Sequence, residues 1–498
     1  MTKKVVKGSM WTLGGSILPM MVSLVATPFT IRMLGPENYG VVLLVGLIPT
    51  YFAFADFGMG VGSTVFASAA YGEGNRPKET EVVWTATFIA AVSAMLVALP
   101  IFIFAGLIID QFNVPAGVRP EAVTGLRITS TAFVIGVLTS VLNSPLLARL
   151  RMDLNTITQA TPKVLLSGGT PIVLFLGGGV IGAISWAFVA GLIGFVLLLI
   201  FAFRLLPELR NFKIDRELIR PLLKFGIGLV VANIAGILLM NFEKLALPKL
   251  VSVEALAFYS VAFTFAGMAS LFTGAMNQSL APAFAQLAVP GKEEEFDALF
   301  GRMMRLNLIW LPPALMGLFV IAKPFFTLWA GEAFGRESTG PFYILLFGLF
   351  FNILAHIPHG TITAKRRTDI FAKLYWIELV IYVVATIALI NWLGIAGAAA
   401  AYSIRVILDA FIIIWFSKRV AGVSFRIFNH FWTLLAGIVL LLPPVVFAAF
   451  YDNFSLWLLA IVPLSLAAYS FLIWRYFVVS DEREWFKQMI GNRLSFFR

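Results

Sequence analysis

The chain of 498 residues contains no cysteine, and only 13% of its residues are charged. Without cysteine there can be no disulfide and no thiolate metal site. Hydrophobic residues make up 60% of the chain, and its mean hydropathy is +0.91. A soluble domain could not bury that much apolar side chain, so we expect most of the chain to face lipid.

Several functional signatures are missing as well. The sequence has no Walker A loop, which excludes an ATPase of its own, and no His-Glu-x-x-His or Gly-x-Ser-x-Gly motif. It has no long polar segment to carry acidic catalytic residues and no channel-like selectivity filter. We therefore expect a protein that is neither an enzyme nor a channel.

Long apolar runs fill the chain instead. A membrane-spanning helix needs about 20 mostly apolar residues, and about fourteen runs meet that requirement. They lie near 10–33, 41–70, 83–109, 121–148, 157–177, 180–205, 219–242, 254–288, 303–323, 341–363, 371–391, 394–417, 430–450 and 455–479. The sequence therefore predicts an all-α integral membrane protein.

The basic residues predict its orientation. If the amino terminus is cytoplasmic, the inner connections carry most of the Lys and Arg, as at Arg149, Arg151, 204–224, 365–367 and 418–419. This asymmetry is the positive-inside pattern and places both termini in the cytoplasm. The net charge of +11 then reflects topology and contact with anionic lipid headgroups, not nucleic-acid binding.

Short motifs recur at nearly constant spacing. The turn "IRMLGPENYG" (31–40) is matched by "LPKLVSVEALAFYS" (247–260), "ARLRMD" (148–153) by "AKRRTD" (364–369), and "GVIGA" (179–183) by "GIAGA" (394–398). We interpret these pairs as two parallel repeats of six helices. The predicted lobes are 1–206 and 207–418, and residues 419–498 add two helices and a tail. Facing lobes of this kind are typical of alternating-access transporters.

Other motifs resemble a known family. "KGSMWTLGG", "IRMLGPENYGVVLL" and "FADFGMG" are similar to the amino-terminal signature of bacterial polysaccharide flippases, and "AKPFFTLWAGEAF" and "LGIAGAAAAY" are similar to their carboxy-terminal half. These flippases belong to the multidrug/oligosaccharidyl-lipid/polysaccharide (MOP) exporter superfamily. The resemblance implies two six-helix lobes around a central cavity.

The resemblance also implies a function. Such flippases move undecaprenyl-diphosphate-linked oligosaccharide units for O-antigen, capsule or exopolysaccharide synthesis from the inner to the outer leaflet of the bacterial cytoplasmic membrane. A polysaccharide polymerase is then a possible partner, besides membrane lipids. The alternatives are an ion-coupled multidrug exporter and a peptidoglycan-precursor flippase of the same superfamily. No cofactor is expected, and a coupling ion would be a proton or sodium.

Charges within the predicted spans are the candidate site residues, because intramembrane charge is costly. Arg405 lies about halfway along its helix, and Asp409 follows one turn later on the same face. The matching positions of the first repeat are Ala190 and Gly194, so these charges are not needed to build a lobe. Together with Glu378 they form either a phosphate-binding or proton-coupled network, or an ion pair that holds two helices together.

Two further arginines lie nearer the outer side. Arg127 is about two turns into its helix, and Arg32 lies at the end of the first helix. Each either extends to the membrane interface or forms the outer part of a cationic cavity.

Four other residues complete the candidate set. Asp56 lies inside the second run before several glycines, where it either couples an ion or caps a bent helix. Glu243 occupies a position that, by the resemblance, is usually aspartate late in helix seven. Asn277 and Gln278 either contact sugar hydroxyls or form interhelical hydrogen bonds.

Two further patterns lie outside this candidate set. His356 and His359 are three residues apart but lack nearby carboxylate or thiol partners, so no metal site is predicted. The tail "DEREWFKQMIGNRLSFFR" (481–498) predicts an amphipathic helix on the cytoplasmic membrane surface.

Overall fold

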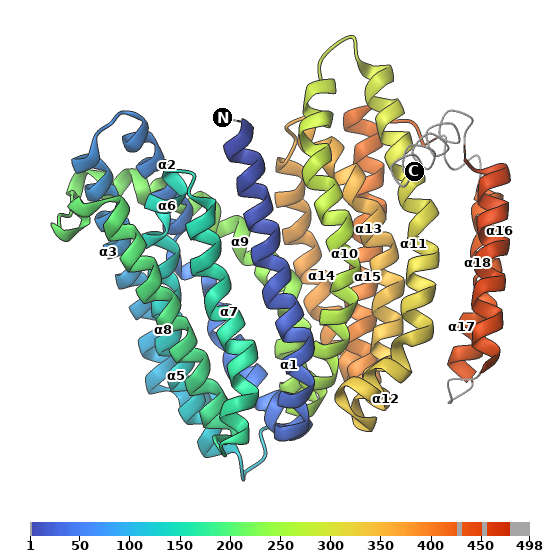
Figure 1. Ribbon diagram of the computed structural model, residues 1–498, viewed down its shortest axis with the longest axis horizontal. Coiled ribbons are helices and arrows are strands. Elements are labelled where there is room, and N and C mark those ends of the chain that lie inside the picture. Colours follow the sequence, from blue (N-terminus) through green and yellow to red (C-terminus); the bar gives the residue numbers. More distant parts are fainter. Residues whose placement is uncertain (1, 426–430, 451–455, 479–498) are drawn as a thin grey trace, which may run out of the picture. The chain divides into compact units, whose positions relative to one another are not determined.

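The structure is a computed structural model that describes residues 2–425, 431–450 and 456–478. Within these ranges every regular element is a helix (Figure 1). The elements are α1 (Thr2–Thr50), η1 (Ala53–Asp56), α2 (Met59–Gly72), α3 (Arg76–Ile103), α4 (Ala105–Ile109), α5 (Arg119–Leu142), α6 (Ser144–Ala148), α7 (Met152–Phe175), α8 (Gly179–Leu205), η2 (Pro207–Arg210), α9 (Arg216–Leu250), α10 (Val253–Leu287), α11 (Glu293–Ala330), α12 (Glu332–Glu337), α13 (Thr339–Ala364), α14 (Asp369–Leu393), α15 (Ile395–Ala421), α16 (Phe431–Leu440), α17 (Leu442–Phe450) and α18 (Leu456–Tyr476).

The membrane-protein class is confirmed. Among the described residues, 11 helical segments are long and apolar enough to cross a membrane. The first two predicted runs are joined in α1, where Gly35 has non-helical backbone angles (φ 74°, ψ 166°). Glycine adopts that conformation without steric cost, and Pro36 cannot continue the preceding ladder. The turn expected at Gly35 and Pro36 is therefore present.

Contacts divide the chain into two compact units. Unit 1 comprises the described residues of Met1–Phe258 together with Tyr375–Ile395, and unit 2 comprises those of Tyr259–Leu374 and Ala396–Arg498. This division follows packing, so it separates most of α14, from Tyr375 on, from its sequence neighbours. The predicted lobes follow the sequence repeat and stay a prediction.

The turns "IRMLGPENYG" and "LPKLVSVEALAFYS" pack against each other inside unit 1. A Cβ added to Gly40 would lie 2.0 Å from the carbonyl oxygen of Val253, so only glycine permits this approach. Around it, Val41, Leu44 and Leu256 join one buried cluster with side chains of α3, α5 and α8. The stretch "IRMLGPENYG" is thus a packing element that meets its own counterpart.

The turns "ARLRMD" and "AKRRTD" have the same local structure. Leu150 and Arg366, at the same place in "ARLRMD" and "AKRRTD", both adopt positive φ (54° and 59°). In each motif the second arginine pairs with the aspartate two residues later, from Arg151 Nη2 to Asp153 Oδ2 at 2.8 Å and from Arg367 Nε to Asp369 Oδ1 at 3.0 Å. The motif pair therefore reflects equivalent turns.

The last helices of unit 2 pack onto its core. The hydroxyl of Tyr469 in α18 donates hydrogen bonds to the carbonyls of Leu308 (3.1 Å) and Ile309 (3.0 Å) in α11. Figure 1 shows α16 and α18 side by side. An apolar groove of about 350 Å³ lies between α11, α13, α16 and α17, with Phe319 stacked on Tyr343 in its wall. The helices α16 and α17 therefore line a groove together with α11 and α13.

Candidate functional site

The predicted second span is broken at Asp56. The 3-10 turn η1 ends there, Phe57 and Gly58 take left-handed φ values of 48° and 65°, and α2 begins at Met59. Asp56 Oδ1 accepts a 2.8 Å hydrogen bond from the Gly58 N–H. The carboxylate thus caps loosened backbone, which is the structural interpretation given above. Its coupling role stays a prediction.

Helix α9 packs closely against this break. A Cβ on Gly226 would lie 1.8 Å from the carbonyl oxygen of Phe57, and one on Gly62 would lie 3.4 Å from the ring of Phe225. Glycine at 226 is therefore required for α9 to approach the Phe57 carbonyl this closely. If α9 moves, the backbone at the break must move as well, because closely packed interfaces have little free space.

Farther along α9 lies a polar cluster that we call the Glu243 cluster: Tyr51, Asn241, Glu243, Lys244 and Tyr382. Glu243 is fully buried, and its Oε2 accepts a 2.6 Å hydrogen bond from the hydroxyl of Tyr382 in α14. Tyr51 donates its hydroxyl to the backbone carbonyl of Asn241, and Lys244 Nζ donates to Asn241 Oδ1 at 3.2 Å. The cluster joins α9 to α14 and to the residue that follows α1.

One face of α14 extends this cluster. Glu378, Tyr382 and Thr386 are buried at intervals of one helical turn. The opposite face carries the exposed apolar side chains of Ile377 and Val384. Glu378 therefore lies on the same face as the tyrosine that contacts Glu243, within unit 1.

Arg405 and Asp409 belong to α15 in unit 2. The Arg405 guanidinium carbon lies 5.2 Å from the centre of the Tyr402 ring, a cation–π distance. Tyr402 in turn packs edge-to-face on Phe263 of α10 at 5.0 Å, and Asp409 is buried. An aromatic ring thus orients the arginine. Its role in phosphate binding stays a prediction, as does a network of these residues with Glu378.

Arg127 and Arg32 are both exposed. Arg127 lies 5.7 Å from the ring centre of Phe102, itself an exposed residue near the end of α3. Arg127 thus contacts an exposed aromatic ring, and this contact fits either of the two expected roles. Arg32 lies on α1 just before the Gly35 turn. Cavity roles for both stay predictions.

The remaining predictions concern Asn277, Gln278, the tail and the two histidines. Asn277 and Gln278 lie in α10, but their side chains are outside the described residues, as is the tail 481–498. The ring of His359 stacks on Phe371 at 3.9 Å. No group of three or more His, Cys, Asp or Glu that could hold a metal is found in the part of the chain that the structure describes.

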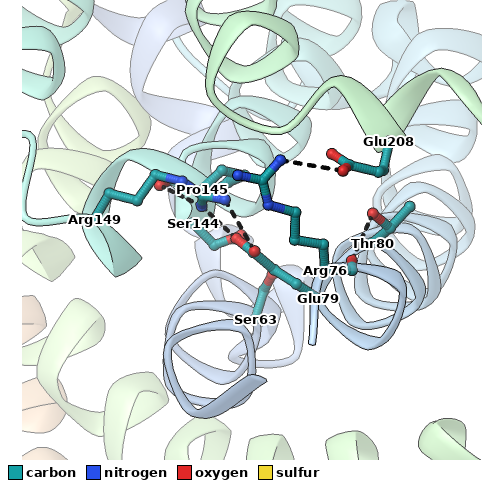
Figure 2. Close-up of polar contacts among 8 residues, drawn as sticks. All are labelled: Ser63, Arg76, Glu79, Thr80, Ser144, Pro145, Arg149 and Glu208. Carbon is teal, nitrogen blue, oxygen red and sulfur yellow. Dashed lines mark hydrogen bonds and ion pairs between the residues drawn. The ribbon is translucent and has the colours of Figure 1, made fainter. Parts of the chain in front are cut away.

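Sequence reasoning missed the buried ion pair of Glu79 and Arg149 (Figure 2). Arg149 Nη2 lies 3.0 Å from Glu79 Oε2, Nη1 contacts Oε1, and the two side chains are 9% and 0% exposed. The guanidinium also donates to the Pro145 carbonyl at 3.2 Å and lies 4.6 Å from the Tyr71 ring centre. Glu79 follows the N-cap Asn75 and resembles a solvated first-turn acid, so nothing local indicated its burial.

The Glu243 cluster was missed in part. Glu243 and Glu378 were candidates, whereas Asn241 and Tyr382 were not. A tyrosine one helical turn after an intramembrane carboxylate was the available signal for Tyr382. The backbone contact from Tyr51 to Asn241 joins residues 190 positions apart, which no local pattern indicates.

Comparison with known proteins identifies the family. The model of the family described as "Polysaccharide biosynthesis protein" matches residues 5–288, more than half of the chain. The chain belongs to this polysaccharide biosynthesis family. A relative in Shigella flexneri named "Putative O-antigen transporter" is 23% identical to this family member over 420 residues, covering 84% of this chain and 99% of the relative.

Solved structures share the fold. The lipid II flippase MurJ in an inward closed conformation superposes with a TM-score of 0.73 at 14% identity, covering 94% of this chain and 98% of that one. An inward-facing multidrug transporter of the MATE family in the MOP superfamily gives a TM-score of 0.67 at 14% identity, covering 82% and 98%. The family resemblance that the motifs indicated is confirmed by the family match, and the solved structures show that this polysaccharide biosynthesis family protein, a multi-pass membrane protein, shares their fold.

Proposed function

We propose that this chain is an alternating-access flippase that moves undecaprenyl-diphosphate-linked oligosaccharide repeat units from the inner to the outer leaflet of a bacterial cytoplasmic membrane, and that it has no enzymatic activity. The observation that carries this proposal is the family match together with the full-length similarity to a protein named an O-antigen transporter. The cargo assignment rests on the chemistry of the candidate residues as well.

The proposed architecture has fourteen spans, arranged as two parallel six-helix lobes (1–206 and 207–418) with two added helices. The equivalent turns at Leu150 and Arg366, with their Arg–Asp pairs, support the repeat. The distribution of Lys and Arg supports cytoplasmic termini.

The Glu243 cluster is the proposed coupling site. A fully buried carboxylate inside spanning helices is expensive and is a functional site by default. When a proton or sodium ion binds Glu243, the charge of the carboxylate is neutralised, and the hydrogen bond that it accepts from the Tyr382 hydroxyl weakens. The contact of α9 with α14 changes as a result. Because Gly226 of the same helix packs on Phe57, the change reaches the break that Asp56 caps.

Arg405 is the proposed contact for the diphosphate. A phosphate group cannot cross bare hydrocarbon, so the cargo headgroup requires a wet cationic path. Arg127 and Arg32 extend this path toward the outer side, Asn277 and Gln278 contact the sugar hydroxyls, and Asp409 orients Arg405 from one turn away. Glu378 extends the coupling cluster.

The fold does not distinguish a flippase from a drug exporter, because both kinds of solved structure match. Cationic, apolar drugs call for an acidic cavity, whereas Arg405 within α15 favours an anionic cargo.

The experiment is a lipid analysis of cells with and without the gene. Undecaprenyl-diphosphate-linked oligosaccharide is extracted, quantified and assigned to a leaflet with a membrane-impermeant probe, in a strain that has the active pathway and no redundant flippase. We expect the complete unit to accumulate on the inner leaflet only when the gene is missing. An unchanged pool would overturn the proposal and leave the drug exporter.

A further inference from the structure

Two consecutive prolines interrupt the backbone hydrogen bonds of α11. In an α-helix each N–H bonds the carbonyl four residues earlier, and proline has no N–H. Pro312 therefore leaves the carbonyl of Leu308 without its helical donor. Pro313 does the same to the carbonyl of Ile309. The helix nevertheless continues through both prolines.

These carbonyls lie deep within α11, where an unpaired polar group is costly. Leu308 is 15 residues after Glu293 and 22 before Ala330, so it is about 22 Å from the nearer end of the helix. The helix is one of the segments that are long and apolar enough to cross a membrane. In a membrane span, prolines are tolerated where a neighbouring helix supplies the missing donor.

The donor comes from α18. The hydroxyl of Tyr469 contacts both carbonyl oxygens, at 3.1 Å for Leu308 and 3.0 Å for Ile309. Its single proton is therefore shared between the two acceptors that the prolines leave free. The side chain is 3% exposed and belongs to the buried cluster that also contains Leu311. Close packing thus fixes the position of the hydroxyl.

Helix α16 packs on the same tyrosine. A Cβ added to Gly437 would lie 3.1 Å from Cε2 of Tyr469, so the lack of a side chain at this position lets α16 approach the ring. Pro312 also lines the groove of about 350 Å³ described above, together with Ile438 of α16. The helices α16 and α18 are therefore packed against α11 at its two prolines.

Unit 1 contains the same kind of arrangement. Pro49 in α1 removes the N–H that would bond the carbonyl of Val45. The hydroxyl of Thr129 in α5 donates to that carbonyl at 2.8 Å. In both units, a hydroxyl from another helix thus replaces an N–H lost to proline. Tyr469 differs because it serves two freed carbonyls at once.

We propose that Pro312 and Pro313 form a hinge in α11 and that Tyr469 is its latch, so that α18 controls the bend of α11 through one hydroxyl. Prolines inside a helix bend it and remove the hydrogen bonds that resist further bending. While the hydroxyl is in place, it restrains both freed carbonyls. When α18 moves away, this restraint is lost and the bend changes. The hinge and its latch go beyond the proposed function, because they give α18 a regulatory role within unit 2.

Amide hydrogen exchange of the purified full chain tests the latch. Tyr469→Phe removes the hydroxyl and keeps the ring, so the amides of α11 on either side of the two prolines should exchange about fivefold faster or more. Tyr476→Phe, at an exposed tyrosine of the same helix, is the matched control and should exchange as wild type does. Equal exchange of α11 in the two variants would overturn the proposal.

A second background separates the latch from an ordinary packing contact. In Pro312→Ala/Pro313→Ala, alanine supplies the two N–H groups that the freed carbonyls lack, and it continues the helix without strain. Adding Tyr469→Phe to this background should therefore accelerate exchange in α11 far less than it does in wild type. The same acceleration in both backgrounds would mean that the hydroxyl does not act through the freed carbonyls, and the inference would be wrong.

Leaflet assays test whether transport uses the hinge. Pro312→Ala/Pro313→Ala stiffens α11 and should slow translocation of the glycan lipid several-fold, while blotting of membranes should show normal insertion. Translocation at the wild-type rate would overturn the hinge and leave the proposed function intact. If the wild-type chain itself fails to translocate the glycan lipid while the exchange results hold, the proposed function is wrong and the latch stands.

Discussion

The hydroxyl of Tyr382 and the carboxylate of Glu243, 139 positions apart in the chain, are joined by a 2.6 Å hydrogen bond in the interior of unit 1. A phenol is a neutral donor that also accepts, so it can partner the carboxylate when it is charged and when it is protonated. The bond ties the orientation of Glu243 to the position of α14. Both proposed states of the coupling site therefore involve this pair.

Replacing Tyr382 by Phe should impair both stability and transport. The change removes one donor from a fully buried carboxylate, which costs about 1–3 kcal/mol. Thermal unfolding of purified protein measures the loss of stability, and leaflet assays measure transport. Tyr343→Phe, at a stacked tyrosine in unit 2, is the control. Unchanged unfolding and transport in Tyr382→Phe would exclude a role for the bond.

Arg405 should tolerate lysine better than alanine. Arg405→Ala should impair glycan translocation without blocking membrane insertion, whereas Arg405→Lys should keep partial activity because it keeps the charge but not the planar guanidinium over Tyr402. Quantitative blotting of membranes checks insertion, and the leaflet assay checks transport. Normal flipping by Arg405→Ala would disprove phosphate binding at this position.

The membrane-protein class and the turns could be predicted from the sequence, because both depend on local chemistry. Apolar length predicts spans, and Gly35–Pro36 predicts the break between the first two. The matched turns could be predicted because both keep Ala, Arg and Asp at the same spacing, and Leu150 and Arg366 share a positive φ. The six-helix repeat itself stays a prediction.

The residues that pair with buried charges could not be predicted from the sequence. Glu79 has the sequence context of a first-turn surface acid, yet it is fully buried against Arg149, 70 positions away. Likewise, α7 was predicted as one more run, and its packing between α1 and α8, as where Gly194 meets Pro162, follows from no local pattern. Such facts depend on tertiary contacts between helices.

Glycine at position 226 should be irreplaceable, unlike another glycine of the same helix. In Gly226→Ala the new Cβ would overlap the Phe57 carbonyl oxygen, so α9 must move away from the break. Gly236→Ala meets no atom within 4 Å and should stabilise α9 slightly through the helix propensity of alanine. Unfolding temperature and leaflet transport should both fall for Gly226→Ala only. Equal behaviour of the two variants would refute tight packing at Phe57.

The pair of Arg151 and Asp153 should give a small stabilisation that is lost in acid. The hydrogen bond that the Asp153 carboxylate accepts from Arg151 holds the pKa of Asp153 below its usual range. The contribution is therefore present above the unfolded-state pKa of about 3.9 and disappears as pH falls through the folded-state value. Because both side chains are partly exposed, Asp153→Asn should cost less than about 1 kcal/mol at neutral pH. Unfolding of both proteins between pH 7 and pH 3 should show this difference narrowing; a constant difference would contradict the pair's role.

The buried pair of Glu79 and Arg149 should be far more sensitive than its exposed neighbour, the 3.3 Å pair of Arg76 and Glu208 (Figure 2). Glu79→Gln leaves a buried guanidinium without its counter-charge and should cost about 3–5 kcal/mol, whereas Arg76→Gln should cost less than about 1 kcal/mol. Combining Glu79→Leu with Arg149→Met should recover much of the loss, because neither charge then remains to be solvated. Denaturant unfolding in detergent gives the three free energies. A double variant no more stable than Glu79→Gln would mean that the contacts of Arg149 with Pro145 and Tyr71, and not its charge balance, hold this end of unit 1 together.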